Sequence, residues 1–217
     1  MKHTMKVSLA AVLLLAGCSS EIDGKPAAKV ADAKDAKKPE PVKDAKPDAT
    51  AAPAKTLKVD AATSKIGFVG HKVTGDHTGE FKAFTGEAQV AGKDAKSVSF
   101  TVDTTSVTTD ADGLTDHLKS PDFFDVAKFP KASFTSTSVA AKAGEGGATH
   151  EITGDLDLHG VKKTISFPAT ITVDERGAKG KAEFTINRKD FQIVYAGKPD
   201  DLIKDEVLLK LDLAFAG

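Results

Sequence analysis

The chain has 217 residues, of which 40% are hydrophobic, and its 30 basic and 31 acidic side chains leave a formal net charge of −1. This length and composition predict one domain with a sizeable core, and the balanced charge argues against a nucleic-acid partner. The single cysteine excludes an intramolecular disulfide, a CxxC redox pair and a multi-cysteine zinc site.

The first residues have the pattern of an export signal. Two lysines precede the apolar run Val7–Leu15, which is too short to span a bilayer as a helix. Leu-Ala-Gly-Cys closes the run and resembles the lipobox of bacterial lipoproteins, which predicts a signal peptide at 1–17 and a lipidated Cys18. Ser19, in place of aspartate, matches lipoproteins sorted to the outer membrane, so we expect an envelope protein anchored there and facing the periplasm. The alternative is an ordinary secretory signal followed by a buried cysteine.

Residues 18–55 hold this cysteine and a segment that cannot form a core. The segment consists mainly of Ala, Lys, Asp and Pro, and five prolines recur between positions 26 and 53. Prolines at this density prevent a continuous helix, and the mixed charges keep the chain in water. We therefore expect a disordered linker, which as a flexible coil would span on the order of 35 Å.

The remaining residues, 56–217, alternate between apolar and polar side chains in successive segments, as strands with one buried face do. Turn residues separate the segments, for example at His159-Gly160. Pro168 interrupts one segment and favours an edge or a bulge at that point. The alternating segments occupy 57–59, 65–70, 98–102, 132–136, 152–158, 165–173, 180–186 and 207–215.

Short turns between half-apolar strands predict antiparallel pairing, and a long antiparallel sheet must close or form a sandwich to hide its edges. The fold class is therefore all-β, and we expect a barrel of about eight strands with a short helical cap. Barrels of this size either fill with side chains or hold one small ligand. The inward positions mix Phe and Leu with small residues such as Gly154 and Ala182, so a filled core and an apolar tunnel both stay open.

The helical cap is predicted where the alternation stops, between 112 and 134. Asp112 has the side chain of a helix N-cap, and Leu114, His117 and Leu118 follow at a spacing that places them on one helical face. A second helical turn is expected at Ser120–Phe124, because serine caps helices and proline is tolerated at the first helical position. The cap would then cover one end of the barrel.

The polar clusters carry weak chemical signals. His71, His77 and Glu80 could bind a metal, but their spacing matches no demanding zinc pattern, so hydrogen-bonded surface roles are favoured. His117 lies between aspartates but has no partnered nucleophile in the sequence, which favours a structural role over acid–base catalysis. Arg188 is expected to pair with nearby Asp190, or else to seat a polar head group. We predict no catalytic residue, no metal and no cofactor.

The six segments 64–71, 79–86, 117–125, 154–161, 187–191 and 205–207 together resemble a known family. In order and spacing they are similar to the YceI-like family of bacterial polyisoprenoid-binding proteins, and the resemblance covers Leu57–Phe215. It implies a lipocalin-like antiparallel barrel that holds an isoprenoid or similar amphiphile in an apolar tunnel, in a family that is not generally enzymatic. Leu114 departs from the pattern, since many members carry a basic residue there.

The expected function is non-enzymatic binding or carriage of an isoprenoid-type lipid, such as a quinone, in the cell envelope. Phe123, Phe124 and Phe129 are the expected gate, and His117 and Arg188 are the expected polar cap. The expected wall consists of Phe68, Phe100, Phe134, Leu156, Leu158, Phe167, Phe184, Leu209 and Leu211.

Two alternatives come from other functional classes. One is a lipid-acting hydrolase or isomerase in which His117 serves as the base. The other is a structural or stress-interaction lipoprotein whose barrel is filled by its own side chains.

Overall fold

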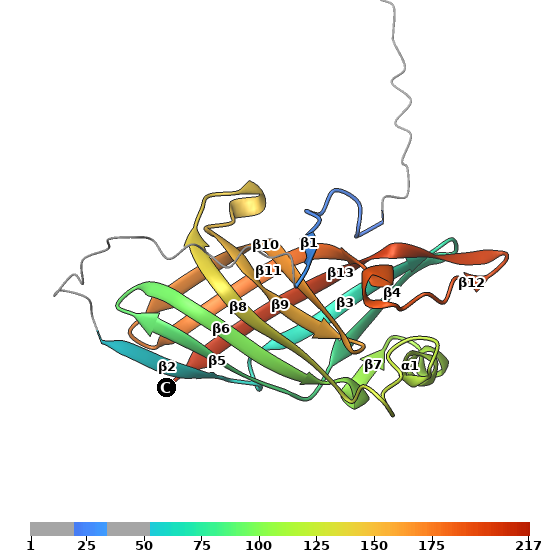
Figure 1. Ribbon diagram of the computed structural model, residues 1–217, viewed down its shortest axis with the longest axis horizontal. Coiled ribbons are helices and arrows are strands. Elements are labelled where there is room, and N and C mark those ends of the chain that lie inside the picture. The colour runs from blue at the N-terminus through green and yellow to red at the C-terminus, as the bar shows by residue number, and fades with distance from the viewer. Residues whose placement is uncertain (1–19, 34–52) are drawn as a thin grey trace, which may run out of the picture.

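The computed structural model describes residues 20–33 and 53–217 (Figure 1). The expected signal peptide, Cys18 and the linker residues 34–52 lie outside these ranges. The strands are β1 Lys29–Asp32, β2 Ala54–Val59, β3 Lys65–Lys72, β4 Gly75–Phe81, β5 Phe84–Ala91, β6 Asp94–Asp103, β7 Val107–Thr109, β8 Lys131–Ala141, β9 His150–Leu158, β10 Val161–Asp174, β11 Gly177–Asn187, β12 Gly197–Lys198 and β13 Asp201–Ala216. The helices are α1 Asp112–Lys119 and the 3₁₀ turns η1 Thr104–Ser106, η2 Glu145–Gly147 and η3 Arg188–Phe191.

Eight strands close into an antiparallel barrel (Figure 1). In ring order they are β2, β5, β6, β8, β9, β10, β11 and β13, and β11 closes the ring because it pairs with both β10 and β13. Closure satisfies the backbone groups that a free edge would expose. The predicted all-β barrel of about eight strands is confirmed. Within the two described ranges, no helix has the length and apolar character needed to cross a membrane.

The long strand β13 joins the barrel to an extension of its wall. One edge of β13 pairs with β11, and the other pairs with β2 at the C-terminal end and with β3 over most of its length. β4 and β7 continue the sheet beyond β3. This extension lies at the end of the barrel that also carries α1, η3 and the turns β3–β4 and β12–β13, which we call the cap end (Figure 1).

Strand register aligns residues that the alternation predicted for the wall. Leu209 on β13 lies opposite Phe184 on β11 and opposite Phe68 on β3. Phe100 on β6 lies opposite Phe134 on β8. Because side chains of paired residues point to the same face of a sheet, these five converge on the barrel interior.

Pro168 lies inside β10, where its missing N–H is harmless. On one side β10 pairs with β9, and Pro168 is opposite Glu151 in that ladder. On the other side the partner changes: β1 ends its pairing at Ser166, and β11 begins at Thr170. The proline therefore occupies an edge-like gap between two partners, as its chemistry requires.

The cap differs in detail from the prediction. Helix α1 forms, but its N-cap is Ala111, with no side-chain hydrogen bond, and Asp112 is already inside the first turn. The expected second helical turn at Ser120–Phe124 is absent and is replaced by a non-helical turn. The backbone N–H groups of Phe123 and Asp125 both donate to the Ser120 carbonyl, so the chain folds back at the end of α1 instead of continuing.

The first described residues contradict the prediction of an unbroken disordered linker. Residues 20–33, which we call the strap, lie along the outside of the barrel, and their strand β1 pairs with β10 (Figure 1). Ile22 is buried against Val69 and Leu208, which point outward from the wall. Composition missed this because the strap has little apolar surface of its own, and its partners lie far along the chain. The rest of the linker stays a prediction.

Candidate functional site

The barrel interior contains an apolar cavity of about 200 Å³ that extends from the middle of the barrel to the cap end. Eleven of the twelve residues predicted for the wall and gate line it, all except Phe129. They come from β3, β6, β8, β9, β10, β11, β13 and the turn after α1. These eleven are Phe68, Phe100, Phe123, Phe124, Phe134, Leu156, Leu158, Phe167, Phe184, Leu209 and Leu211.

A second, smaller cavity of about 60 Å³ lies on the opposite side of the interior, toward the end away from the cap. The two cavities share Phe100, Phe134, Phe167 and Leu211 in their walls. The rings of Phe100 and Phe134 stack at a centroid distance of 5.4 Å, and those of Phe134 and Phe167 lie 5.6 Å apart. We call these four residues the partition, because they separate the two spaces.

The cavity volumes decide between the filled core and the apolar tunnel, which the alternation pattern left open. An apolar cavity of about 150 Å³ holds one benzene molecule, and pockets for drug-sized ligands measure about 300–1,000 Å³. The larger cavity here therefore accommodates a single ring or a short branched chain. A long prenyl tail requires the partition to move. The interior is neither completely filled nor an open tunnel.

Two of the expected gate residues close the cavity at the cap end. Phe123 is 8% exposed, and Phe124 packs edge-on against Phe68 and Phe81, at centroid distances of 6.2 Å and 5.5 Å. Leu118 on α1 is buried in the same cluster. The turn after α1 thus supplies an aromatic cover over the apolar space.

Phe129 does not belong to the gate, which corrects the prediction. Its ring packs against His159, at a centroid distance of 4.7 Å, and fills the place that a side chain at Gly160 would need. Its carbonyl accepts a hydrogen bond from the Thr104 hydroxyl. Phe129 therefore fixes the exit of the cap segment from outside the cavity. Aromatic content alone could not show this, because the turn reverses the chain between Phe124 and Phe129.

His117 also lies outside the cavity, contrary to the expected polar cap. Its Nε2 atom is 2.9 Å from Asp122 Oδ2, and its ring packs edge-on against Phe123 and Tyr195, at 5.0 Å and 4.9 Å. These contacts hold the turn after α1 against the loop that follows η3. They support the structural role that sequence reasoning favoured, and they place the ring behind the aromatic cover.

Arg188 does line the cavity, but its polar atoms face the protein. The side chain is 4% exposed, and its nitrogens donate to the carbonyls of Ile193, Ile203 and Lys204. Its carboxylate partner is Asp205, at 3.3 Å, so the predicted pair with Asp190 is wrong. Burial lowers the pKa of the Arg188 guanidinium, and the charge of Asp205 partly offsets this. Arg188 therefore ties η3 and the following loop to β13.

Residues 57–215 match the YceI-like domain family. The chain belongs to this family. It is 41% identical over 123 residues to the protein YceI of Escherichia coli O6:H1, a match that covers 53% of this chain and 62% of that protein, so less than two thirds of the relative is aligned. It is 35% identical over 147 residues to a UPF0312 protein of Pseudomonas savastanoi pv. phaseolicola, covering 64% and 72% of the two chains.

Two solved structures share the barrel. The crystal structure of BcnA from Burkholderia cenocepacia superposes with a TM-score of 0.62 at 28% identity, over 72% of this chain and 98% of BcnA. A polyisoprenoid binding domain from Saccharophagus degradans, described as implicated in plant cell wall breakdown, gives a TM-score of 0.59 at 21% identity, over 74% and 98%. The second likeness shows the fold alone.

The YceI-like barrel uses wall residues that sequence reasoning did not select. Some, such as Ile66 and Val207, continue the alternation of predicted strands and could have been chosen from it. Ile193 lies in a loop and Ile203 at a strand start, where alternation gives no signal. Both reach the cavity because Arg188 bonds to their carbonyls and holds this part of the chain against the barrel.

Two glycines of the YceI-like segments are explained by interior aromatic rings. A Cβ atom on Gly79 would overlap the ring of Phe68, its neighbour across the β3–β4 ladder. A Cβ atom on Gly154 would overlap the ring of Phe134 and the backbone of β8. Both rings therefore lie over glycine, which sets how far each one reaches into the cavity.

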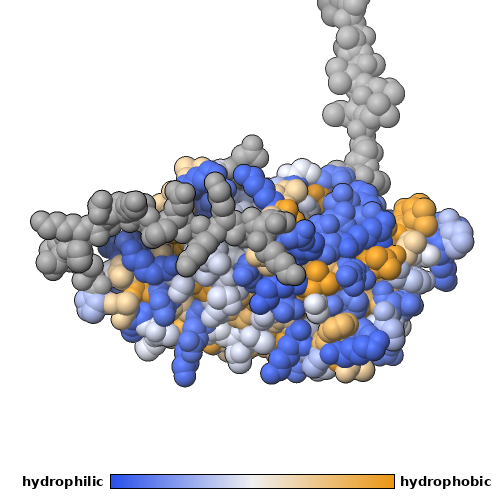
Figure 2. Space-filling model, viewed as in Figure 1, coloured by the Kyte–Doolittle hydropathy of each residue, from blue (hydrophilic) through white to orange (hydrophobic). Residues whose placement is uncertain are grey.

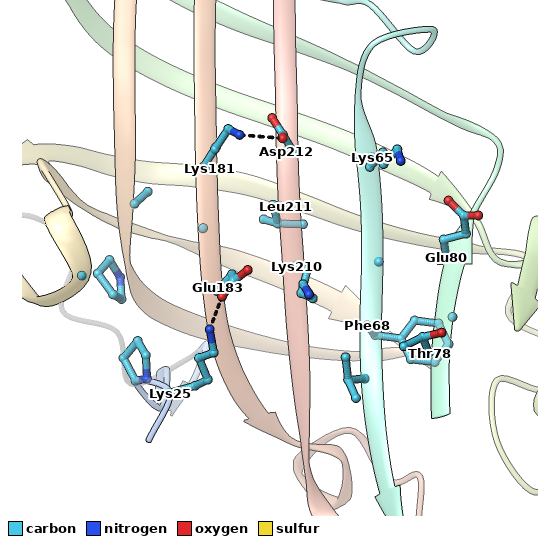
Figure 3. A pocket seen from close by; sticks show the side chains of 18 of the residues that line it. Lys25, Lys65, Phe68, Thr78, Glu80, Lys181, Glu183, Lys210, Leu211 and Asp212 are labelled. Atoms are coloured by element: carbon cyan, nitrogen blue, oxygen red, sulfur yellow. Dashed lines mark hydrogen bonds and ion pairs between the residues drawn. The ribbon is translucent and has the colours of Figure 1, made fainter. Parts of the chain in front are cut away.

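A more voluminous hollow, about 1,140 Å³, lies on the outside of the YceI-like barrel (Figure 3). Charged side chains border it and largely pair with one another: Lys181 lies 2.9 Å from Asp212, and Lys25 bonds to Glu183. This wall of paired charges does not match the chemistry of a prenyl tail. We therefore take the interior cavity as the candidate site.

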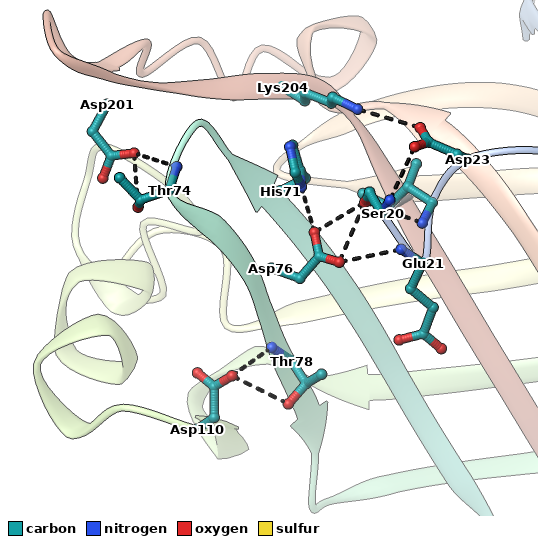
Figure 4. Close-up of polar contacts among 11 residues, drawn as sticks. Ser20, Glu21, Asp23, His71, Thr74, Asp76, Thr78, Asp110, Asp201 and Lys204 are labelled. Atoms are coloured by element: carbon teal, nitrogen blue, oxygen red, sulfur yellow. Dashed lines mark hydrogen bonds and ion pairs between the residues drawn. The ribbon is translucent and has the colours of Figure 1, made fainter. Parts of the chain in front are cut away.

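His71 and His77, near the cap end, each contact an aspartate. His71 bonds to Asp76 (Figure 4). His77 Nδ1 lies 2.9 Å from Asp110 Oδ1. Glu80, the third residue of the weak metal signal, bonds to Lys82 instead. The parts of the chain at 20–33 and 53–217 contain no group of three or more side chains placed to bind a metal ion.

Proposed function

We propose that this protein binds the apolar part of an isoprenoid-type lipid inside its barrel and carries it without chemical conversion. The observation that carries the proposal is the interior cavity. Twenty-four of its 29 wall residues are apolar or glycine, and they come from the closed barrel, the adjoining strands β3 and β4, and the cap end. Each methylene withdrawn from water contributes ~0.8 kcal/mol, so a five-carbon prenyl unit would gain ~4 kcal/mol without any polar contact.

The polar wall residues suggest where a head group would lie. Four of the five, His71, Lys72, His77 and Arg188, lie on elements at the cap end, and Ser133 lies near the start of β8. A tail placed in the interior would direct its head group toward this end. The name of the Saccharophagus degradans domain, which describes polyisoprenoid binding in a related barrel, supports the ligand class.

The position of His117 argues against the alternative in which it acts as the base of a lipid hydrolase or isomerase. Its ring bonds to Asp122 and packs behind Phe123, outside the apolar space. A general base must reach the proton it removes, and a tail in the cavity does not bring reacting atoms to this ring.

The cellular part of the proposal rests on the lipobox-like sequence that ends at Cys18. We propose that Cys18 is acylated and holds the protein on the envelope membrane, on the periplasmic side of the outer membrane. A carrier attached to a membrane would exchange its ligand with that membrane or with proteins on it.

Native mass spectrometry of the full-length protein, purified from the envelope of a bacterial host, tests the proposal. We expect adducts with the mass of prenyl lipids. In a second arm, Leu158→Trp fills the cavity near the cap end and should abolish the adducts, whereas Ala143→Trp, at an exposed position, should keep them. Protein without lipid that also fails to bind added prenyl alcohols would contradict the proposal.

A further inference from the structure

Among the described residues, three large apolar side chains are exposed, and all three lie at the cap end. Val73 is 69% exposed in the β3–β4 turn, Val194 is 63% exposed in the loop after η3, and Leu202 is 51% exposed near the start of β13. The Val73 N–H donates to the Leu202 carbonyl at 3.1 Å, so two of the three are neighbours. Figure 2 shows apolar surface at this end of the molecule, at the right of the view. We call these three residues the rim.

Each rim residue lies next in sequence to a residue of the cavity wall. Val73 follows Lys72, Val194 follows Ile193, and Leu202 precedes Ile203. Leu202 and Ile203 are adjacent on strand β13, so their side chains point to opposite sides, Ile203 toward the cavity and Leu202 outward. Val73 and Val194 are exposed in a turn and a loop, beside the wall residues Lys72 and Ile193. The rim is therefore the outer surface of the same segments that enclose the ligand space.

The strap begins beside the rim. The Ser20 hydroxyl donates to Asp76 Oδ1 at 3.0 Å, and the Glu21 N–H donates to Asp76 Oδ2 at 3.2 Å (Figure 4). Asp76 is only three residues beyond Val73 and lies across the same turn. The chain therefore enters the described structure at the cap end.

Several contacts hold the strap on the barrel. Glu21 bonds to Lys210, Asp23 lies 3.4 Å from Lys204, and the buried Ile22 lies between them in sequence. Exposed ion pairs contribute little each, so the buried apolar cluster around Ile22 is the main attachment. These contacts attach the chain at Ser20, and therefore the residues that precede it, to the barrel.

Only Ser19 lies between Cys18 and Ser20, and the two residue steps from Cys18 to Ser20 span at most about 7 Å. An acyl chain on Cys18 would therefore be held close to the cap end of the barrel. This differs from the reach of about 35 Å that a free linker would allow. The segment 34–52 follows the strap in the chain and does not lengthen this connection.

From these observations we propose that the cap end is a docking surface for a lipid bilayer, with Val73, Val194 and Leu202 inserted into the interfacial region. The strap sets this orientation when Cys18 is acylated. The inference rests on the proposed lipid-binding function and adds to it that the ligand passes between bilayer and cavity at the rim. The partner is a bilayer and not a protein, because the strap delivers the anchored residue to this end.

Charges at the rim are paired with neighbouring protein groups, so they contribute little to the attraction between the rim and a bilayer. Lys72 lies 2.7 Å from Asp201, and the same carboxylate accepts hydrogen bonds from the Thr74 N–H and hydroxyl. Binding should therefore depend on apolar contact and change little between low and moderate salt.

Vesicle flotation of residues 18–217 carrying Cys18→Ser, without the predicted signal peptide, tests the rim without the anchor. Vesicles of phosphatidylethanolamine and phosphatidylglycerol should bind this protein weakly. The triple variant Val73→Ser, Val194→Ser, Leu202→Ser should lower the partition coefficient about tenfold or more, since about 1.4 kcal/mol changes an equilibrium tenfold. The matched control, Ala61→Ser, Ala143→Ser, Ala216→Ser, alters exposed positions elsewhere and should bind as before.

A fluorescent label locates the contact. In the Cys18→Ser chain a new cysteine is unique, because the sequence has no other. An environment-sensitive dye on Leu202→Cys should shift to shorter emission wavelength when vesicles are added, and the same dye on Ala143→Cys should not. A shift at 143 without one at 202, or equal flotation of the rim and control variants, would overturn the proposal.

A third measurement separates this inference from the proposed function. Binding of a soluble prenyl alcohol is measured without vesicles for the parent and the rim variant. Retained binding in both, with vesicle binding lost only in the rim variant, supports the docking surface. Retained prenyl binding with unchanged flotation rejects the docking surface alone. Loss of prenyl binding in the parent rejects the proposed function, whatever the flotation shows.

Discussion

Arg188 shows how the surroundings of a single residue decide its role. Sequence reasoning allowed either an ion pair with Asp190 or a seat for a ligand head group. The structure directs the guanidinium to three carbonyls and to Asp205, while the side chain still borders the cavity. Because its nitrogens are bonded to protein groups, this buried cation holds η3 and the next loop in place and does not bind a ligand head group.

Replacing Arg188 with alanine should lower the free energy of unfolding by about 3 kcal/mol, because buried carbonyls lose their donor. Lys189→Ala is the matched control, since Lys189 pairs with the same Asp205 but is largely exposed and should cost less than about 1 kcal/mol. Urea unfolding of the two variants measures both values. Equal losses would contradict the structural role of Arg188.

Asp76 gives the strap a dependence on pH. The hydrogen bond from His71 is the main cause that lowers the pKa of Asp76, and the Glu21 N–H and Ser20 hydroxyl add to it against the effect of burial. A lowered pKa in the folded state means that the carboxylate stabilises the contact at higher pH and that this contribution is lost as pH falls. The groups that contact Asp76 are the His71 ring on β3 and the Ser20 hydroxyl and Glu21 N–H on the strap.

Because the pKa of Asp76 is lowered, we expect the Ser20 hydroxyl and the Glu21 N–H to stay bonded to Asp76 at about pH 4, where an ordinary aspartate becomes protonated, and to leave it only at lower pH. Amide chemical shifts recorded by NMR between pH 7 and pH 2.5 measure this change. Asp76→Asn should remove most of the shift, whereas Asp94→Asn, which alters a distant surface pair with Lys96, should not. A transition that persists in Asp76→Asn would show that another group controls the strap.

At the scale of elements, the partition and the strap contacts are each built from several strands that are distant in the sequence. The partition joins β6, β8, β10 and β13 across the interior through Phe100, Phe134, Phe167 and Leu211. The strap joins β1 to β10 and places Ile22 over β3 and β13. Each depends on strands that the barrel brings together.

Phe100→Ala should open the partition and join the two cavities. We expect tighter binding of longer prenyl alcohols relative to short ones, at a stability cost of about 3 kcal/mol. Competition binding with prenyl alcohols of increasing length measures the preference. Phe129→Ala removes an aromatic ring outside the cavity, so it should leave the length preference unchanged. The same preference in Phe100→Ala and the parent would show that the partition does not limit the ligand.

Ile22→Ala should release the strap without unfolding the barrel. The lost burial weakens strap docking by about 2 kcal/mol, and hydrogen exchange in residues 20–32 should rise accordingly. Ala31→Ser changes an exposed strap residue and serves as the control. If exchange rises equally throughout the barrel, Ile22 belongs to the global fold and the strap is not an independent unit.

At the scale of the whole molecule, the proposed anchor and the cap end work together. Cys18→Ser should move the protein from the membrane fraction to the soluble fraction of a Gram-negative host, because the remaining rim contact is weak. Ser19→Asp should keep the protein lipidated but retain it in the inner membrane. Fractionation with acyl labelling distinguishes the two. Membrane association that survives Cys18→Ser unchanged would refute the anchor.

The sequence by itself determined the all-β class, because alternation with a period of two requires strands with one buried face, and a long sheet of such strands must close into a barrel or form a sandwich. For the same reason it identified most of the cavity wall, including Phe68, Phe134 and Leu209. It could not place Phe129 or His117, since a turn reverses the cap segment through contacts with residues far along the chain. Only the tertiary structure showed the strap, because Ile22 is buried by residues that face outward from two distant strands. The size of the cavity was likewise decided by packing, because volume depends on how rings from several strands meet and not on the pattern of any one of them.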